Sequence, residues 1–128
     1  MKSFTKILLT LLLSLTFAHA AAFSKDAKSR SITAHITAEQ PLTTGANTLV
    51  LTLKKNAKSI SDATVTLKAF MPAMPGMPAM SSKVEAKNLG DGKYQATLNL
   101  AMSGTWQLYI YIIPKTGKKS RIKTTLNL

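Results

Sequence analysis

The sequence predicts an all-β protein, a seven-stranded immunoglobulin-like antiparallel β-sandwich. Three observations lead to this prediction. Apolar and polar residues alternate with a period of two, short turn signals separate the alternating runs, and no stretch has helical periodicity. Short strands in this number within one domain suit such a sandwich, and a small closed barrel is the main alternative. The chain has 128 residues, which allows one domain with a packed core.

The first three predicted strands each have one apolar face. The run 31–38 alternates Ile and Ala with Thr and His, and the run 47–54 alternates Leu with Val, Thr and Lys. The run 63–71 alternates Ala, Val and Leu with Thr and Lys. Successive side chains of a strand point to opposite faces, so each run suits an antiparallel strand that is buried on one side.

The remaining four strands follow the same pattern, although the run 83–87 is shorter and weaker. The run 93–100 alternates Tyr, Ala and Leu with polar residues, and 105–113 alternates Trp, Leu and Ile with Gln and Tyr. The run 121–127 closes the series. Glycine, asparagine, aspartate and proline lie between the runs and predict turns there.

The first 20 residues are predicted to be a signal peptide. Lys2 and Lys6 precede an eleven-residue apolar run, 7–17, and Ala18-His19-Ala20 has the small residues of a cleavage site. The run is too short for a membrane span of about 20 residues. Residues 21–30 are polar and predict a flexible arm before a folded domain at 31–128. The protein is therefore expected to be periplasmic or otherwise exported, and soluble after cleavage.

The composition leaves little material for catalysis. There is no cysteine, and the chain has two histidines and five Asp and Glu residues, so we expect a protein that is not an enzyme. The 17 Lys and Arg residues give a formal net charge of +12. Because an exported protein meets little nucleic acid, we expect no such partner; the basic surface suits an acidic partner or an anionic membrane surface.

The segment 71–80 (MPAMPGMPAM) has a methionine at every third position. A residue before proline avoids the helical region, so the segment is expected to be extended. Pro75-Gly76 suits the two central positions of a type II turn. Such a turn brings Met74 and Met77 together, with two thioethers on one side.

Thioether sulfur is a soft, neutral donor that favours Cu(I) or Ag(I) over zinc, calcium or magnesium. Residues 69–82 contain no charged side chain, which suits a monovalent soft ion and not a hard divalent one. Two other interpretations remain open. The methionines could form a contact surface for a partner, or fold back as a hydrophobic plug.

The connection between the strands at 93–100 and 105–113 is expected to lie near this methionine segment. It carries Met102, and Trp106 follows at the start of the next strand. The face of a tryptophan ring attracts a cation, so Trp106 is a candidate wall of the metal site. Trp106 is also in phase with Leu108 and Ile110, which predicts a core residue.

Four motifs in this order together resemble the YtkA-like/FixH-like exported domain. They are Asp62-Ala63-Thr64-Val65, Met71-Pro72-Ala73-Met74-Pro75, Gly92-Lys93-Tyr94 and Met102-Ser103-Gly104-Thr105-Trp106-Gln107-Leu108. The resemblance covers about residues 31–127 and implies an immunoglobulin-like sandwich associated with copper handling or cytochrome oxidase assembly. The methionine segment is also similar to copper-resistance proteins of the CopC type. Those proteins use an N-terminal histidine for Cu(II), which a chain beginning at Ala21 lacks.

We therefore predict an exported protein that binds Cu(I) as its cofactor, for copper buffering, delivery or support of efflux. The expected partner is a membrane copper transporter, an efflux system or an oxidase-assembly component. The alternative is an interaction module without metal, whose Met/Pro loop and basic surface contact a membrane complex. The candidate metal ligands, with Trp106 as a neighbouring wall, are Met74, Met77, Met71, Met80 and Met102.

Overall fold

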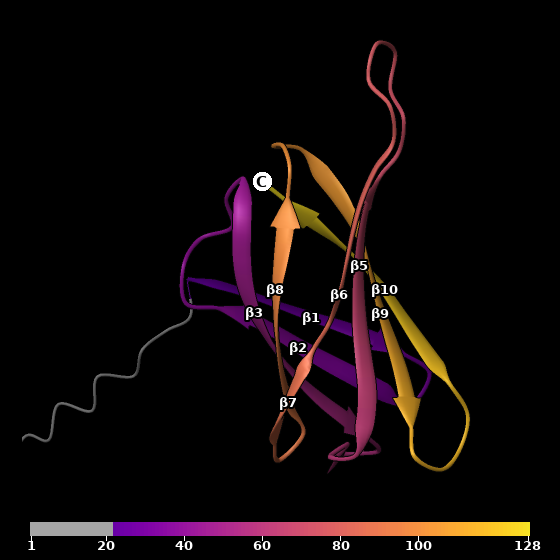
Figure 1. Ribbon diagram of the computed structural model, residues 1–128. Coiled ribbons are helices and arrows are strands. Elements are labelled where there is room, and N and C mark those ends of the chain that lie inside the picture. Colours follow the sequence, from indigo (N-terminus) through magenta and orange to yellow (C-terminus); the bar gives the residue numbers. More distant parts are fainter. Residues whose placement is uncertain (1–21) are drawn as a thin grey trace, which may run out of the picture.

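The computed structural model describes residues 22–128, which form two packed antiparallel sheets (Figure 1). The signal peptide predicted for residues 1–20 lies outside the described residues. The strands are β1 (Phe23–Ser29), β2 (Ile32–Ala38), β3 (Gly45–Lys55), β4 (Lys58–Ser59), β5 (Ala63–Met71), β6 (Met80–Glu85), β7 (Lys87–Gly90), β8 (Lys93–Leu100), β9 (Thr105–Pro114) and β10 (Ser120–Asn127).

The first sheet, sheet A, has the order β1-β2-β3-β8-β7, and the short β4 pairs with β3. The second, sheet B, has the order β10-β9-β5-β6. The apolar faces of the predicted strands meet between the two sheets, as the period of two requires. Trp106 and Tyr94 are the largest of the fully buried side chains in this core.

The all-β prediction and the sandwich are confirmed, but the number of strands was wrong. Ten strands form within the described residues, where the alternation predicted seven, and the immunoglobulin-like arrangement is not confirmed. The predicted ranges 63–71 and 93–100 coincide with β5 and β8. The other four clear runs correspond to β2, β3, β9 and β10, within two residues at each end.

The flexible arm predicted for residues 21–30 was also wrong, since most of it forms β1. This strand pairs along its whole length with β2, from Phe23 opposite Ala38 to Ser29 opposite Ile32. Ala27 is the one fully buried residue of β1, which lies at the edge of sheet A and exposes Asp26 and Lys28. An edge strand of this kind has a mostly polar sequence, so alternation of apolar residues does not predict it.

The weak strand predicted at 83–87 is two strands in different sheets. β6 belongs to sheet B and β7 to sheet A, and the chain crosses between the sheets at Ala86. The Ala86 amide still donates a hydrogen bond to the Val65 carbonyl, at 2.8 Å. The short alternation therefore reflects a strand that changes partner midway.

On one side of the sandwich, a lysine side chain connects the two sheets. Lys25 on β1 donates hydrogen bonds through Nζ to the Thr125 carbonyl at 2.6 Å and to Thr125 Oγ1 at 3.0 Å. Thr125 is on β10, so the contact connects the edge strands of the two sheets. Lys25 is thereby held in the fold and does not belong to the free basic surface.

Tyr94 holds the end of the sandwich that carries the β4–β5 connection. Its buried hydroxyl donates to the Ile60 carbonyl at 2.7 Å and accepts from the Ala63 amide at 3.2 Å. Gly92, two residues earlier, has φ +77, and a Cβ there would lie 2.9 Å from Ser59 Cβ. The Gly92-x-Tyr94 motif thus packs β8 against the β4 region, and only glycine fits the close approach.

We expect Tyr94→Phe to lower the free energy of unfolding by about 1 to 3 kcal/mol, because the Ile60 carbonyl and the Ala63 amide both lose a partner. Urea denaturation monitored by circular dichroism measures the change. Tyr109→Phe is the matched control, since its hydroxyl bonds only to Gln107 on the outer face of sheet B. Equal stability of the two variants would contradict the role of the Tyr94 hydroxyl.

No helix among residues 22–128 is long and apolar enough to cross a membrane.

Candidate functional site: the methionine end

Three connections of the sandwich meet at one end, which we call the methionine end. They are the β2–β3 connection (39–44), the β5–β6 connection (72–79) and the β8–β9 connection (101–104). Gly45 lies opposite Leu100, and Phe70 lies opposite Gln107, so the ends of these strands adjoin. The expectation that the methionine segment and Met102 lie at the same end is confirmed.

The β5–β6 connection continues the two strands as a long hairpin that stands out from the body (Figure 1). Met71 pairs with Met80 at its base, and Met74 forms a bridge with Met77 at its tip. The isolated Met74–Met77 bridge keeps the register of β5 and β6, although the residues between it and the Met71–Met80 pair are not paired. We call residues 71–80 the methionine hairpin.

The tip has the turn that Pro75-Gly76 predicts. The Met77 amide donates to the Met74 carbonyl at 2.8 Å, and the Met74 amide donates to the Met77 carbonyl at 3.0 Å. Gly76 has φ +80, the value that the second central residue of a type II turn requires. Directly opposed residues of a ribbon point to the same face, so the turn sets the two thioethers beside each other.

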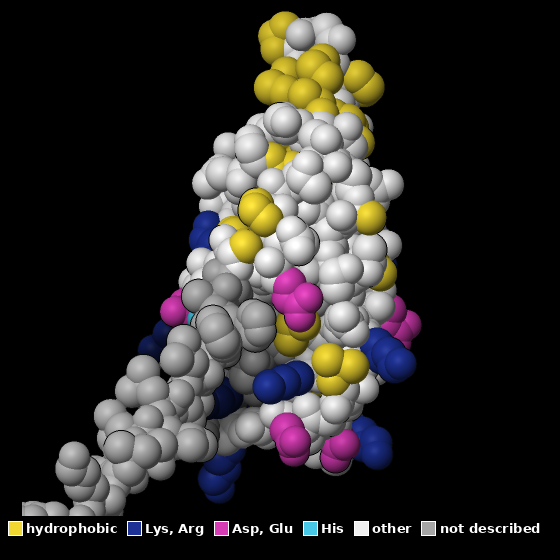
Figure 2. Space-filling model, turned by 90° about the vertical axis from the view of Figure 1, so that its left-hand side faces the viewer, with side chains coloured by type: hydrophobic (Ala, Val, Ile, Leu, Met, Phe, Trp, Pro, Cys, Tyr) yellow, Lys and Arg dark blue, Asp and Glu magenta, His cyan; other side chains and the backbone are white. Residues whose placement is uncertain are grey.

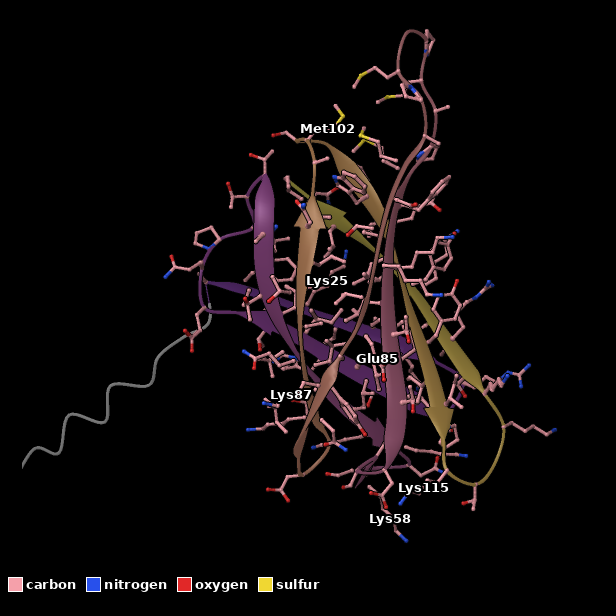
Figure 3. The ribbon with its side chains drawn as sticks, in the orientation of Figure 1. Lys25, Lys58, Glu85, Lys87, Met102 and Lys115 are labelled. Atoms are coloured by element: carbon pink, nitrogen blue, oxygen red, sulfur yellow. The ribbon has the colours of Figure 1, made fainter. Side chains whose placement is uncertain are left out.

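Exposure divides the five methionines of the described chain into three groups. Met74 and Met77 are 46% and 38% exposed at the tip. Met80 and Met102 are partly buried against the core, and Met71 is only 3% exposed. Figure 3 shows the sulfur atoms gathered at this end, with Met102 labelled on the β8–β9 connection. The tip pair is therefore the part that a metal ion reaches without rearrangement.

The hairpin base rests on the β8–β9 connection. A Cβ on Gly104 would lie 3.0 Å from Met71 Cε, and Gly104 has φ +135, a conformation that side chains rarely adopt. Gly104 therefore lets the buried Met71 side chain approach the backbone that carries Met102. This function of Gly104 was not predicted from the sequence, where the one signal for it is its position between Met102 and Trp106.

Trp106 is a core residue, as its phase with Leu108 predicts. It is 1% exposed, and its indole Nε1 donates a hydrogen bond to the Met102 carbonyl at 2.9 Å. The ring thus holds the β8–β9 connection from below. Its contribution as a wall of a metal site stays a prediction, and the contact that the structure shows is the hydrogen bond to the Met102 backbone.

The hairpin carries no charge, and Figure 2 shows hydrophobic side chains covering the side of it that faces the viewer. Across the three connections of the methionine end, Glu39 is the one ionisable side chain. Soft neutral donors on an uncharged hairpin suit Cu(I) or Ag(I) and discriminate against hard divalent ions.

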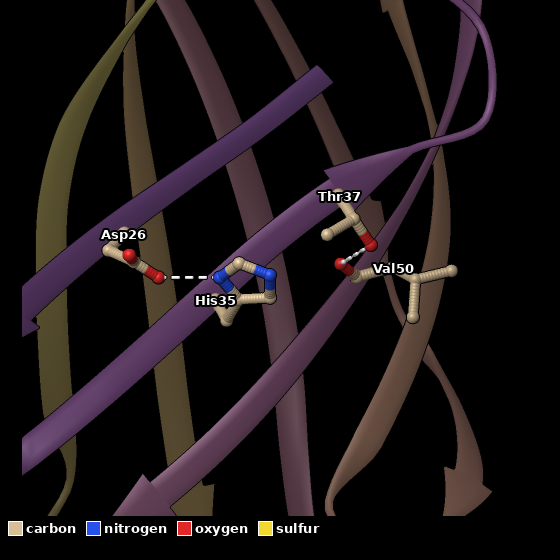
Figure 4. Close-up of polar contacts among 4 residues, drawn as sticks. All are labelled: Asp26, His35, Thr37 and Val50. Carbon is tan, nitrogen blue, oxygen red and sulfur yellow. Dashed lines mark hydrogen bonds and ion pairs between the residues drawn. The ribbon is translucent and has the colours of Figure 1, made fainter. Parts of the chain in front are cut away.

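The described residues hold no cluster of three His, Asp or Glu side chains that could bind a metal ion. His35 is on the outer face of sheet A, where its Nδ1 lies 2.5 Å from Asp26 Oδ1 (Figure 4). The two residues face each other across β1 and β2, and both are exposed. This contact joins β1 to β2 on the outer face of sheet A and lies apart from the methionine end.

Comparisons with known proteins agree with the fold. The profile of the YtkA-like family matches residues 26–111. The soluble domain of PmoD from a Methylocystis species has a similar structure, with a TM-score of 0.54 and 14% sequence identity. The likeness covers 80% of this chain and 95% of that domain, and at this identity it shows the fold alone. A comparison with curated proteins finds no match. The FixH-like and CopC-type resemblances stay predictions.

Proposed function

This chain belongs to the YtkA-like family, and from that premise we propose that it binds a soft monovalent ion, Cu(I), at the methionine hairpin. In this proposal the protein is exported and non-enzymatic, and it buffers copper, delivers it or supports its efflux. The expected recipient is a membrane copper transporter, an efflux system or an oxidase-assembly component.

The observation that carries the proposal is the bridge between Met74 and Met77. Two thioethers lie opposite each other on a two-residue turn, both exposed, on a hairpin without charge. A hydrophobic pair at the tip of a protruding hairpin gains little from burial, so packing alone does not account for it. Two soft donors in this position suit an ion such as Cu(I), which accepts low coordination numbers and thioether ligands.

The remaining methionines have graded roles. Met80 and Met102 are partly buried near the hairpin base and are candidates for completing the coordination after small side-chain movements. Met71 is buried against Gly104 and supports the base. The proposed ligand order is therefore Met74 and Met77 first, then Met80 and Met102.

The second candidate, an interaction module without metal, is favoured by the same exposure. Residues 72–79 are all exposed and mostly apolar, and exposed methionines adapt to many partner surfaces. A metal titration distinguishes the two functions, because only the first requires that a soft metal ion binds the isolated protein.

We expect the purified protein to bind about one equivalent of Ag(I), used as the redox-stable substitute for Cu(I), and to melt at a higher temperature with it. A ligand at about 100 times its Kd stabilises the native state by about 2.7 kcal/mol. Zn(II) and Ca(II) at the same concentration are expected to leave the melting temperature unchanged. Native mass spectrometry gives the stoichiometry. Absence of Ag(I) binding would favour the interaction module.

A further inference from the structure

Lys and Arg are absent from the three connections of the methionine end, and seven of them lie in or beside the turns at the opposite end; the other Lys and Arg of residues 22–128 lie on the strands between. The turns at the end opposite the methionine hairpin are β1–β2, β3–β4, β4–β5, β7–β8 and β9–β10. Lys or Arg side chains occur in these turns or at the strand residues next to them: Arg30, Lys55, Lys58, Lys93, Lys115, Lys118 and Lys119. Two carboxylates, Asp62 and Asp91, accompany them. We call this surface the basic end.

Backbone hydrogen bonds hold these turns together as one surface. The Asn56 amide donates to the Ser31 carbonyl at 3.1 Å, which connects the β3–β4 and β1–β2 turns. The Lys115 amide donates to the Asp62 carbonyl at 3.2 Å, which connects β9–β10 with β4–β5. Figure 3 shows Lys58 and Lys115 at this end and Met102 at the other. The β1–β2 turn is therefore joined to the β3–β4 turn, and the β9–β10 turn to the β4–β5 turn, by backbone contacts.

The seven cations are free to act on a partner. All are exposed, and none forms an ion pair within the described part of the chain. The methionine end, by contrast, has no Lys or Arg in its three connections. An anionic surface is therefore expected to attract the basic end more strongly than the methionine end, and so to orient the protein as well as attract it.

We propose that the basic end docks on the anionic surface of a lipid bilayer, with the methionine hairpin directed away from the lipid. The seven exposed cations are distributed over several separate turns, which fits a broad anionic surface better than one small anionic ligand. Each Lys or Arg near such a surface contributes about 1 kcal/mol of attraction, and the attraction decays over a Debye length. Seven cations against two carboxylates suffice for reversible, salt-sensitive binding.

The orientation gives the two ends separate tasks. The basic end keeps the protein at the bilayer, and the apolar, uncharged hairpin is presented to whatever lies above the membrane surface. The docking does not depend on metal binding, so either proposal can fail without the other.

The test is co-sedimentation with vesicles of phosphatidylcholine alone and of phosphatidylcholine with phosphatidylglycerol, at low and high salt. The unmodified protein is expected to bind only the phosphatidylglycerol vesicles, and to be released by salt. The triple variant Lys115→Glu, Lys118→Glu, Lys119→Glu is expected to bind them about tenfold or more weakly. These side chains are in an exposed turn, so the fold, checked by circular dichroism, is expected to persist.

The matched control reverses three lysines elsewhere: Lys68→Glu, Lys83→Glu, Lys123→Glu. Their side chains share the outer face of sheet B, where Lys68 lies opposite Lys83 and Tyr109 lies opposite both Lys68 and Lys123. The change in net charge is identical, and a smaller loss in the control supports docking through the basic end. Equal losses would overturn it in favour of net charge alone. Retention on immobilised polyglutamate without binding to phosphatidylglycerol vesicles would also overturn it, in favour of an acidic protein.

Discussion

Replacing Met74 and Met77 together with leucine is expected to abolish most of the stabilisation by Ag(I) and to weaken Ag(I) binding by about a hundredfold or more. Leucine keeps the bulk and apolarity of methionine and removes the sulfur, so the hairpin is expected to persist. The turn depends on Pro75-Gly76 and on the backbone bonds between the two methionines, none of which the change touches. The loss at saturating silver corresponds to about 10 °C or more in melting temperature.

Met71→Leu is the matched control for that experiment. It removes a thioether from the same hairpin, but from a side chain that is 3% exposed and packed on Gly104. Silver binding is expected to be kept in this variant, while Met102→Leu is expected to weaken it to an intermediate degree. An unchanged affinity in the Met74, Met77 double variant would refute the assignment of the tip pair.

Trp106→Phe is expected to destabilise the protein by about 2 to 4 kcal/mol. The Met102 carbonyl loses its donor, which costs about 1 to 3 kcal/mol for a partly buried group. The smaller ring also leaves a cavity beneath the β8–β9 connection, which adds the transfer and cavity terms of a core truncation. Urea denaturation with an unchanged m value measures the loss.

Gln107→Leu, on the outward face of the same strand, is the control for the tryptophan variant and is expected to change stability by no more than about 0.5 kcal/mol. If Trp106→Phe changes the free energy of unfolding as little as Gln107→Leu does, the hydrogen bond to the Met102 carbonyl does not contribute to stability. If silver affinity falls in Trp106→Phe more than the stability change explains, the position of Met102 matters for the metal.

The sequence predicts best the strands in which every second residue is apolar and buried in the core. β5 and β8 have a complete apolar face and lie inside their sheets, so the alternation alone defines their bounds. β1 and β7 are edge strands, and β4 has two residues. These segments form strands because they pair with a neighbouring strand. The residue pattern within one segment does not indicate that neighbour, so these strands cannot be predicted from alternation.

The candidate site divides in the same way. The Met74–Met77 pair follows from a local turn whose residues, Pro75 and Gly76, restrict the backbone directly. The burial of Met71 depends on Gly104, a residue distant in sequence, and spacing within the hairpin does not reveal it. The sequence of the segment therefore predicted that Met74 and Met77 lie side by side. It did not predict which of the methionines are exposed to solvent.

The prolines of the hairpin have a consequence for self-association. A protruding, uncharged apolar ribbon normally offers free backbone amides to a second copy, which is how strands add to one another and how aggregates grow. Pro72, Pro75 and Pro78 remove three of those amides within eight residues. The protein can thus expose an apolar hairpin at high local concentration, and this hairpin does not act as a template for intermolecular β-sheet.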